Sequence, residues 1–419
     1  MVKVKDTTAL SSDGGIDVDL WFHQLSSKGY LDNLQLVRIA CNLSQLSEQE
    51  HATETGQPCL QLGLAMADLL ADLEVDQDTL AAAIIFESVH YGDLSIDVIE
   101  EHLGAPIAKL VMGIEKMSAI HGVQKLNNYP KNKLKTDNVR KMLLAMVDDV
   151  RVVLIKLAER LCILRTAGHL PQPFRTQIAN EAMEIYAPLA NRLGIGAIKW
   201  EMEDLAFHYL HPNEYKEIAK GLKAKRLDRD YFVNGIVEHL NQLIKSTGAQ
   251  HFAVYGRSKH IHSIYKKMKR KNVSLEEIYD ATAVRILLDT EAQCYEVLSL
   301  VHTLWKQIPA EFDDYIINPK SNGYKSLHTA VIGPDNRVFE VQIRTFHMHD
   351  LAEMGVAAHW KYKEGGGSED EGELEKWLRT IKEILDDPQP DAMDFLDTIK
   401  LNLFASEIFV FTPKGEIKT

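Results

Sequence analysis

The chain has 419 residues, of which 45% are apolar and 26% are charged, and its formal net charge at pH 7 is −13. This length exceeds the roughly 250–300 residues at which a single hydrophobic core stops growing, so we expect two or more domains rather than a disordered chain. The net charge excludes a surface that binds nucleic acids without specificity, and any anion site must therefore be local.

Nothing near the N-terminus resembles a targeting signal. The stretch MVKVKDTTALSSDGG lacks the apolar core of a signal peptide, and no run of 18 apolar residues follows it. The cysteines are far apart and form no C-x-x-C pair, which is typical of reduced thiols. We expect a cytoplasmic protein without disulfides, without a cysteine zinc site and without a membrane span.

The apolar pattern changes once along the chain. From about residue 30 to 200, apolar residues recur at spacings of three and four, as in LGLAMADLLADL and DTLAAAIIFESV, which predicts helices only. From HFAVYG onward, short alternating runs separated by helical stretches predict an α+β domain with a mixed sheet. We place the domains at 1–190 and 191–400, and interpret 401–419, with its Pro-Lys-Gly turn between two strands, as the beginning of a further domain that the chain does not complete.

Residues 255–271, YGRSKHIHSIYKKMKRK, contain seven Lys and Arg residues and no acid. At helical spacing Lys259, Ser263 and Lys267 lie four apart and share one face. Such a face is either a solvated helix surface or a site for polyphosphate, and the mutual repulsion of the cations slightly favours the anion site.

Two later stretches supply carboxylates. Asp280 lies at the mouth of the strand predicted for ATAVRILL, where it is either a turn residue or a metal ligand. In RVFEVQIRT, alternation puts Glu340 on the polar face of a strand, which faces either water or a cleft. If Asp280 and Glu340 share a cleft, they offer hard oxygen ligands to Mg²⁺, and the nearby cations then indicate phosphoryl-type transfer.

The segment EFDDYIINPKSNGYKSLHT, residues 311–329, combines acids, a lysine and an aromatic ring. Asn322 and Gly323 predict a tight turn that projects Tyr324, whose ring is either a stacking surface for a nucleobase or an anchor to the core.

These motifs in this order, together with GVAAHWKYK, resemble the long RelA/SpoT homologues, bacterial alarmone synthetases. The resemblance implies a nucleotidyltransferase-like fold, preceded by an HD-type helical domain, and transfer of the β,γ-pyrophosphate of ATP to the 3′-hydroxyl of GTP or GDP with release of AMP. It also implies Mg²⁺ as cofactor, held by Asp280 and Glu340, with Glu340 as the base near the 3′-hydroxyl.

The resemblance assigns the remaining site residues to two substrates. Those implied for ATP are Arg257, which stacks on adenine, and the phosphate ligands Lys259, Ser263 and Lys267. Those implied for GTP or GDP are Tyr324, as the guanine platform, and His328, Gln342 and Arg344. An acidic E-x-D-D segment accompanies a preference for GTP in the RelA-type members, so Glu311, Asp313 and Asp314 are expected to tune the acceptor site.

In the helical domain, the resemblance implies a hydrolase that has lost its metal ligands. The positions at which the family has His, His-Asp, a following acidic pair, a later Asp and an Asn are occupied by other residues: Leu62, Phe86, Glu87, His90, Tyr91, Glu159 and Ile163. A site without its imidazoles cannot bind a transition metal in the usual way, so we expect an inactive hydrolase.

Three alternatives stay open: a bifunctional synthetase and hydrolase, a noncatalytic guanine-nucleotide sensor, and a templated nucleotidyltransferase. The segments FESVHY and EFDD oppose the first, the two carboxylates oppose the second, and the net acidity opposes the third. The resemblance identifies 401–419 as similar to the start of the family's TGS domain, and in the family the region beyond it engages the ribosome and uncharged tRNA. We therefore expect weak activity that ribosomes do not stimulate. ATP, GTP or GDP and the alarmone product are the ligands expected, with no membrane or DNA partner.

Overall fold

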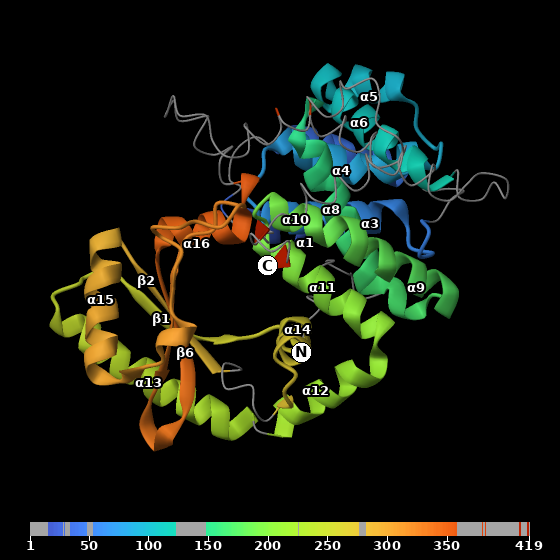
Figure 1. Cartoon of the computed structure of the whole chain (residues 1–419). Coiled ribbons are helices and arrows are strands. Elements are labelled where there is room, and N and C mark those ends of the chain that lie inside the picture. The colour runs from blue at the N-terminus through green and yellow to red at the C-terminus, as the bar shows by residue number, and fades with distance from the viewer. Residues whose placement is uncertain are drawn as a thin grey trace. The chain divides into compact units, whose positions relative to one another are not determined.

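The computed structural model describes residues 16–27, 29, 34–47, 53–122, 148–224, 226–275 and 282–357, together with 379, 382, 410–411 and 417–418. These residues divide into two compact units, with the division along the chain between Arg175 and Thr176 (Figure 1). One unit is helical and the other carries the sheet, which confirms the expected helical domain followed by an α+β domain.

The helical unit is built from seven helices within its described residues. They are α1 (Val18–Ser27), α2 (Gln35–Ser47), α3 (Cys59–Ala71), α4 (Gln77–His90), α5 (Ile96–Leu103), α6 (Ala105–Gly122) and α8 (Val150–Thr166). The 3-10 turn η2 (Ala167–His169) follows, and α9 (Gln172–Glu181) begins in this unit.

Local signals explain where these helices start and how closely they pack. Asp76 caps α4 by accepting a hydrogen bond from the Thr79 amide at 2.7 Å, and Asp149 caps α8 in the same way. Gly63 allows α3 to lie against α4, because a Cβ there would meet the Ile84 carbonyl oxygen at 2.5 Å. The apolar stretch predicted for 78–89 therefore forms a helix that is buried on every side.

The other unit begins with helices and ends in the sheet. Its elements are the π-helix η3 (Ala182–Tyr186), α10 (Ala187–Arg192), α11 (Gly196–Leu210), α12 (Pro212–Ala224), α13 (Arg226–Ser246), β1 (Ala253–Ser258), α14 (Ile261–Lys271), β2 (Thr282–Leu288), α15 (Glu291–Leu304), β3 (Lys306–Gln307), η6 (Pro309–Glu311), β4 (Asp313–Asp314), β5 (Leu327–Ile332), η7 (Pro334–Asn336), β6 (Val338–Thr345) and α16 (Phe346–Met354).

The sheet has the order β1-β2-β6-β5-β3, and β4 also pairs with β5. Strand β2 runs parallel to β6 and antiparallel to β1, whereas β5 and β6 are antiparallel, so the sheet is mixed as predicted. In the parallel pair, Ala283 lies opposite Glu340 and Arg285 lies opposite Gln342. This register brings polar side chains of separate motifs to neighbouring positions.

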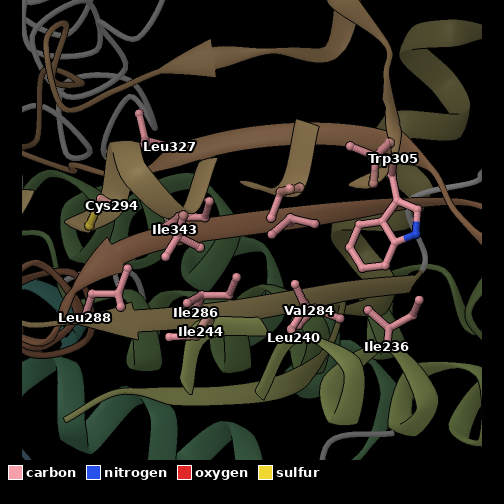
Figure 2. Close-up of a cluster of buried hydrophobic side chains, with 14 of the residues drawn as sticks. Ile236, Leu240, Ile244, Val284, Ile286, Leu288, Cys294, Trp305, Leu327 and Ile343 are labelled. Carbon is pink, nitrogen blue, oxygen red and sulfur yellow. The ribbon is translucent and has the colours of Figure 1, made fainter. Parts of the chain in front are cut away.

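One face of the sheet packs on a hydrophobic core (Figure 2). Leu240 and Ile244 of α13 meet Ile286 of β2 and Ile343 of β6, while Trp305 closes the cluster after α15. Phe339, Val341 and Ile343 are all fully buried, which confirms the predicted apolar face of β6. The alternate residues of β6 are therefore directed away from this core.

The boundary between the units lies nearer the N-terminus than the predicted 190/191 boundary. Residues 176–192 belong with the sheet because the end of α10 is tied to the loop before β5: Asn322 Nδ2 donates to the Asn191 carbonyl at 3.0 Å, and Arg192 Nη1 donates to the Ser321 carbonyl at 3.0 Å. Of the last predicted segment, 401–419, the structure describes β7 (Val410–Phe411) and β8 (Ile417–Lys418), which pair antiparallel.

Candidate functional site

Glu340 is the centre of a polar network on β6. Its Oε2 lies 2.5 Å from the Lys259 ammonium, and its Oε1 accepts from Gln342 Nε2 at 2.7 Å and lies 3.1 Å from His328 Nδ1. The register of β5 and β6 places His328 opposite Gln342. Lys259, predicted for ATP, and His328 and Gln342, predicted for GTP or GDP, therefore meet at one carboxylate.

The surroundings of Glu340 keep it ionised. Burial alone would raise the pKa of this carboxyl, but the hydrogen bond from His328 and the charge of Lys259 hold the pKa well below its usual range. Burial lowers the pKa of His328, so its imidazole is neutral; Nδ1–H then donates to Glu340 and Nε2 accepts from the Tyr324 hydroxyl at 2.8 Å. The result is a carboxylate with oriented donors on both oxygens.

The network continues to two arginines predicted as site residues. Arg257 Nη1 donates to Gln342 Oε1 at 3.0 Å, and its guanidinium lies 5.0 Å from the centre of the Trp200 ring. Arg344 is fully buried; it contacts His349 and Glu353, and its guanidinium carbon lies 5.9 Å from the Tyr324 ring centre. Its Nε and Nη1 have no hydrogen-bond partner among the described residues.

The predicted basic face of residues 259–267 needs a correction. Helix α14 begins at Ile261 after His260 as N-cap, so Lys259 precedes the helix and does not share a helical face with Ser263 and Lys267. The helix starts there because the Ile261 and His262 amides donate to the buried Asp204 carboxylate at 3.2 and 2.8 Å. Lys259 is thereby directed to Glu340 instead.

The three acids at 311–314 lie in different environments. Glu311 pairs with lysines of α14. Asp313 raises the pKa of Tyr315, which burial and this neighbour bring to about 12. Asp314 accepts hydrogen bonds from the Ile316 and Ile317 amides and from the Tyr295 hydroxyl, each at 3.0 Å. The acids therefore do not form one patch.

A cavity of about 220 Å³ opens beside the network. Tyr324, His328 and Arg257 contribute to its wall. So do residues from α10, the turn between α10 and α11, α11, the 320–322 turn and α16: Asn191, Gly194, Gly196, Lys199, Trp200, Lys320, Asn322, Leu351 and Ala352. Burial lowers the pKa of both Lys199 and Lys320. Two aromatic rings, a neutral imidazole and three cationic side chains around one cavity suit a planar, anionic ligand.

The turn that carries Tyr324 forms as predicted. The Gly323 amide donates to the Lys320 carbonyl at 2.8 Å, and Gly323 has a φ of 76°. The Lys320 ammonium lies 4.4 Å from the Tyr315 ring centre and 5.6 Å from that of Tyr324. Both rings therefore already contact a cation.

Asp280 lies outside the described residues. Gln342 and Arg344 are 1% and 0% exposed, so their side chains are covered in this structure. Sequence reasoning missed Lys199 and Trp200 of α11; a cation and an indole at adjacent positions of this helix were the only signal.

In the helical unit, the positions of the expected lost metal ligands are filled by a packed cluster. Leu62 and Phe86 are buried, and the Lys156 ammonium lies 2.5 Å from Glu159 Oε2, 2.7 Å from Ser118 Oγ and 5.5 Å from the Phe86 ring centre. Burial, followed by the charge of Glu159, raises the pKa of Glu87 to about 8. His90 pairs with Glu115 at 2.9 Å.

This cluster does not have the composition of a metal centre. Within the described ranges, no group of three or more His, Cys, Asp or Glu side chains is arranged to hold a metal ion. Cys162 and Ile163 are buried on α8, as is Glu159, and Tyr91 follows α4. The positive charge near the carboxyl groups of Glu87 and Glu159 comes from Lys156.

No helix of the described chain is both long and apolar enough to cross a bilayer.

Two family profiles match the chain. The first, described as "HD domain", matches residues 40–196, and the second, described as "Region found in RelA / SpoT proteins", matches residues 256–367. Every described residue of the Glu340 network lies in the second range. The cluster around Lys156 lies in the first.

Curated relatives match most or all of the chain. A GTP pyrophosphokinase of Escherichia coli K12 is 41% identical over 100% of the chain and 56% of its own length. A probable guanosine-3′,5′-bis(diphosphate) 3′-pyrophosphohydrolase of Synechocystis is 41% identical over 91% of the chain and 50% of its own length. The chain thus spans about half the length of these relatives.

The crystal structure of small alarmone synthetase 1 from Bacillus subtilis with its product pppGpp is 22% identical and covers 40% of this chain and 93% of its own, with a TM-score of 0.29.

Proposed function

Because the chain belongs to the RelA/SpoT family, we propose that its sheet-bearing unit is an alarmone synthetase that uses ATP and GTP or GDP. In this reaction the 3′-oxygen of the acceptor attacks the β-phosphorus of ATP, the bond between that phosphorus and the oxygen of the α-phosphate breaks, and AMP leaves. The 3′-hydroxyl proton passes to a base or to water. One pyrophosphoryl group moves intact.

The observation that carries this proposal is the Glu340 network beside the cavity. Positioning and charge stabilisation do most of the work in phosphoryl transfer, and here a buried carboxylate, Lys259 and Arg257 are held within one chain of contacts. Tyr324 supplies a ring at the same cavity for guanine. Gln342 and Arg344 act as positioning residues, because both are buried.

The low pKa of Glu340 bears on its role. A strongly acidic carboxyl is a poor proton acceptor but a good ligand for a hard cation, so Glu340 in this state suits Mg²⁺ better than it suits a proton. Bound Mg²⁺ would neutralise charge developing on the transferred phosphates. Transfer of Lys259 to a phosphate would remove one cause of the low pKa and make Glu340 a stronger base.

The donor set supports Mg²⁺ in part. Glu340 offers an ionised oxygen ligand, and Mg²⁺ usually takes one or two protein carboxylates together with phosphates and waters. Asp280, the second proposed ligand, precedes Ala283 by three positions, and Ala283 is the register partner of Glu340. Lys259, Ser263 and Lys267 remain proposed phosphate contacts, and Asp313 and Asp314 remain proposed determinants of acceptor choice.

The decisive experiment follows the γ-phosphate of labelled ATP into a guanosine pentaphosphate in the presence of Mg²⁺ and GTP. We expect transfer in the unmutated chain and a loss of about 10²–10⁴-fold in Glu340→Gln and in Asp280→Ala. Glu296→Gln, an exposed acid on α15, is the matched control and should leave the rate unchanged. Binding of both nucleotides without transfer in the unmutated chain would favour the sensor.

We further propose that the helical unit has no hydrolase activity, although one relative is named a probable pyrophosphohydrolase. The support is the position of the Lys156 ammonium. It lies beside Glu159 and near Glu87, the acids that a divalent ion would need as ligands. Incubation of 3′-labelled alarmone with divalent metals should release no pyrophosphate; release that EDTA abolishes would restore the bifunctional alternative.

Cytoplasmic location and contacts of the full protein with ribosomes and uncharged tRNA belong to the same proposal and rest on the family alone.

A further inference from the structure

Glu311 contacts the basic helix, and it does so from a different element. It ends the short 3-10 turn η6, and its carboxylate pairs with Lys271 through Oε1 and lies 3.5 Å from Lys267 Nζ through Oε2. The side chains of Glu311 and Lys271 are each 38% exposed, and that of Lys267 is 19% exposed. One carboxylate therefore spans two lysines that are four apart on the same helical face.

The neighbouring acids cannot take this place. Asp314 is engaged by two amides and the Tyr295 hydroxyl, and Asp313 is beside Tyr315. Glu311 alone among the three reaches α14 in the described chain. The acidic segment thus divides into a turn-forming acid, an acid beside the Tyr315 ring and an acid on the basic helix.

The charge balance of α14 gives a physical reason for this contact. The last six residues of the helix carry five cations and no acid, so their mutual repulsion is relieved only by groups from outside. Lys266 lies 3.6 Å from Glu203 of α11, and Lys269 lies 5.5 Å from the Tyr265 ring centre. Lys267 and Lys271 have Glu311, whose two oxygens are placed as two oxygens of a phosphate would be.

We propose that Glu311 is an internal anion that occupies the phosphate-binding face of α14 and must be displaced by the incoming nucleoside triphosphate donor, so that it sets donor affinity. The inference rests on the proposed function, which places the polyphosphate of ATP at Lys267. It assigns Glu311 to the donor side, whereas the family resemblance implies the acceptor side. Each donor molecule that binds exchanges one carboxylate for phosphate oxygens at Lys267 and Lys271.

The test uses Glu311→Gln in the whole chain, which keeps the shape of the side chain and removes its charge. The probe is ATP with a methylene group between the α- and β-phosphates, because that analogue cannot donate pyrophosphate. We expect its Kd, by equilibrium dialysis, to fall about two- to tenfold. The KM for GTP should change less than about twofold, and the KM for ATP should follow the Kd of the analogue.

Two further variants separate this effect from a general change of charge. Asp289→Asn removes an exposed acid that pairs with His251 and should leave the Kd unchanged. In a Lys271→Gln background, Glu311→Gln should have a smaller effect than in the unmutated chain, because one of the two lysines that it holds is gone.

The outcomes are distinct. An unchanged Kd for the analogue in Glu311→Gln, or a change confined to the KM for GTP, overturns the inference. Analogue binding that responds to Glu311→Gln in a chain that transfers no pyrophosphate supports the inference and rejects the proposed synthetase activity. A chain that does not bind the analogue at all overturns both.

Discussion

Lys156 is a buried cation whose charge the helical unit must balance internally. It is 1% exposed, with Glu159 at 2.5 Å and Ser118 at 2.7 Å, and burial lowers its pKa. Removing one partner from a buried ionic group leaves the other charges uncompensated, which costs about 3–5 kcal/mol. The cluster therefore makes the helical unit sensitive to a single substitution.

We accordingly expect Lys156→Met to lower the free energy of unfolding of the helical unit by about 3–5 kcal/mol. Lys116→Met, at an exposed position of α6, is the matched control and should change it by less than about 0.5 kcal/mol. Calorimetry of the whole chain would resolve the transition. If the two variants had the same free energy of unfolding, Lys156 would not be a structural counter-ion.

Glu87 gives the same unit a pH dependence. In the folded state its carboxyl keeps a proton up to a pKa of about 8, because of burial and then Glu159, whereas an unfolded glutamate releases it near about 4.3. Between these values the folded state binds more protons, so stability falls as pH rises. Glu87→Gln removes this titration and should raise the Tm at pH 8 by about 2–6 °C.

The check is to measure both proteins at pH 5.5 and pH 8. The stabilisation by Glu87→Gln should be largest at pH 8 and markedly smaller at pH 5.5, because the unfolded state has released the proton that the folded state keeps over only about one pH unit below 5.5. A pH-independent difference would assign the effect to packing.

At the scale of elements, a close approach of backbones fixes the end of α16 against the turn before α11. A Cβ on Gly355 would meet the Leu193 carbonyl oxygen at 2.2 Å, and its φ of 55° with a ψ of −129° suits only glycine. The Val356 amide donates to the same carbonyl at 2.9 Å. This contact of residues 355–356 with Leu193, called the Gly355 seam, borders the cavity, because Gly194 and Leu351 line the cavity wall.

Gly355→Ala should therefore destabilise the sheet-bearing unit by more than about 2 kcal/mol and raise the KM for nucleotides. Gly235→Ala, in the interior of α13 with nothing within 4 Å of the added Cβ, should instead stabilise it by up to about 1 kcal/mol. The measurement is the free energy of unfolding of both variants in a chemical denaturant. Similar changes in the two variants would show that the Gly355 seam tolerates a Cβ.

Elements with strong local patterns were predictable from the sequence, whereas their contacts were not. Alternation identified the buried face of β6, and Asn322-Gly323 identified the turn. The start of α14 depends on Asp204, which is more than fifty residues away, so the position of Lys259 outside the helix could not be predicted. The same holds for Trp200 beside Arg257.

At the scale of the whole molecule, the chain has a net charge of −13, yet the site and α14 together hold a local group of cations. The ion pairs at the site are shorter than 4 Å and partly buried, so salt screens them less than it screens the surface. We expect the KM for ATP to change less than about threefold between 50 and 200 mM NaCl. A loss of about 10³-fold or more would instead indicate the many phosphate contacts of a nucleic-acid-binding enzyme.

The parallel pairing of β2 with β6 also has a consequence for biosynthesis. Strand β1 can pair with β2 soon after both are made, but the other edge of β2 awaits β6, whose Glu340 is 57 positions after its partner Ala283. At about 5–20 residues per second, the ribosome leaves that apolar edge open for about 3–11 s. A newly made chain is therefore most exposed to aggregation and to chaperones in the interval before residue 345 emerges.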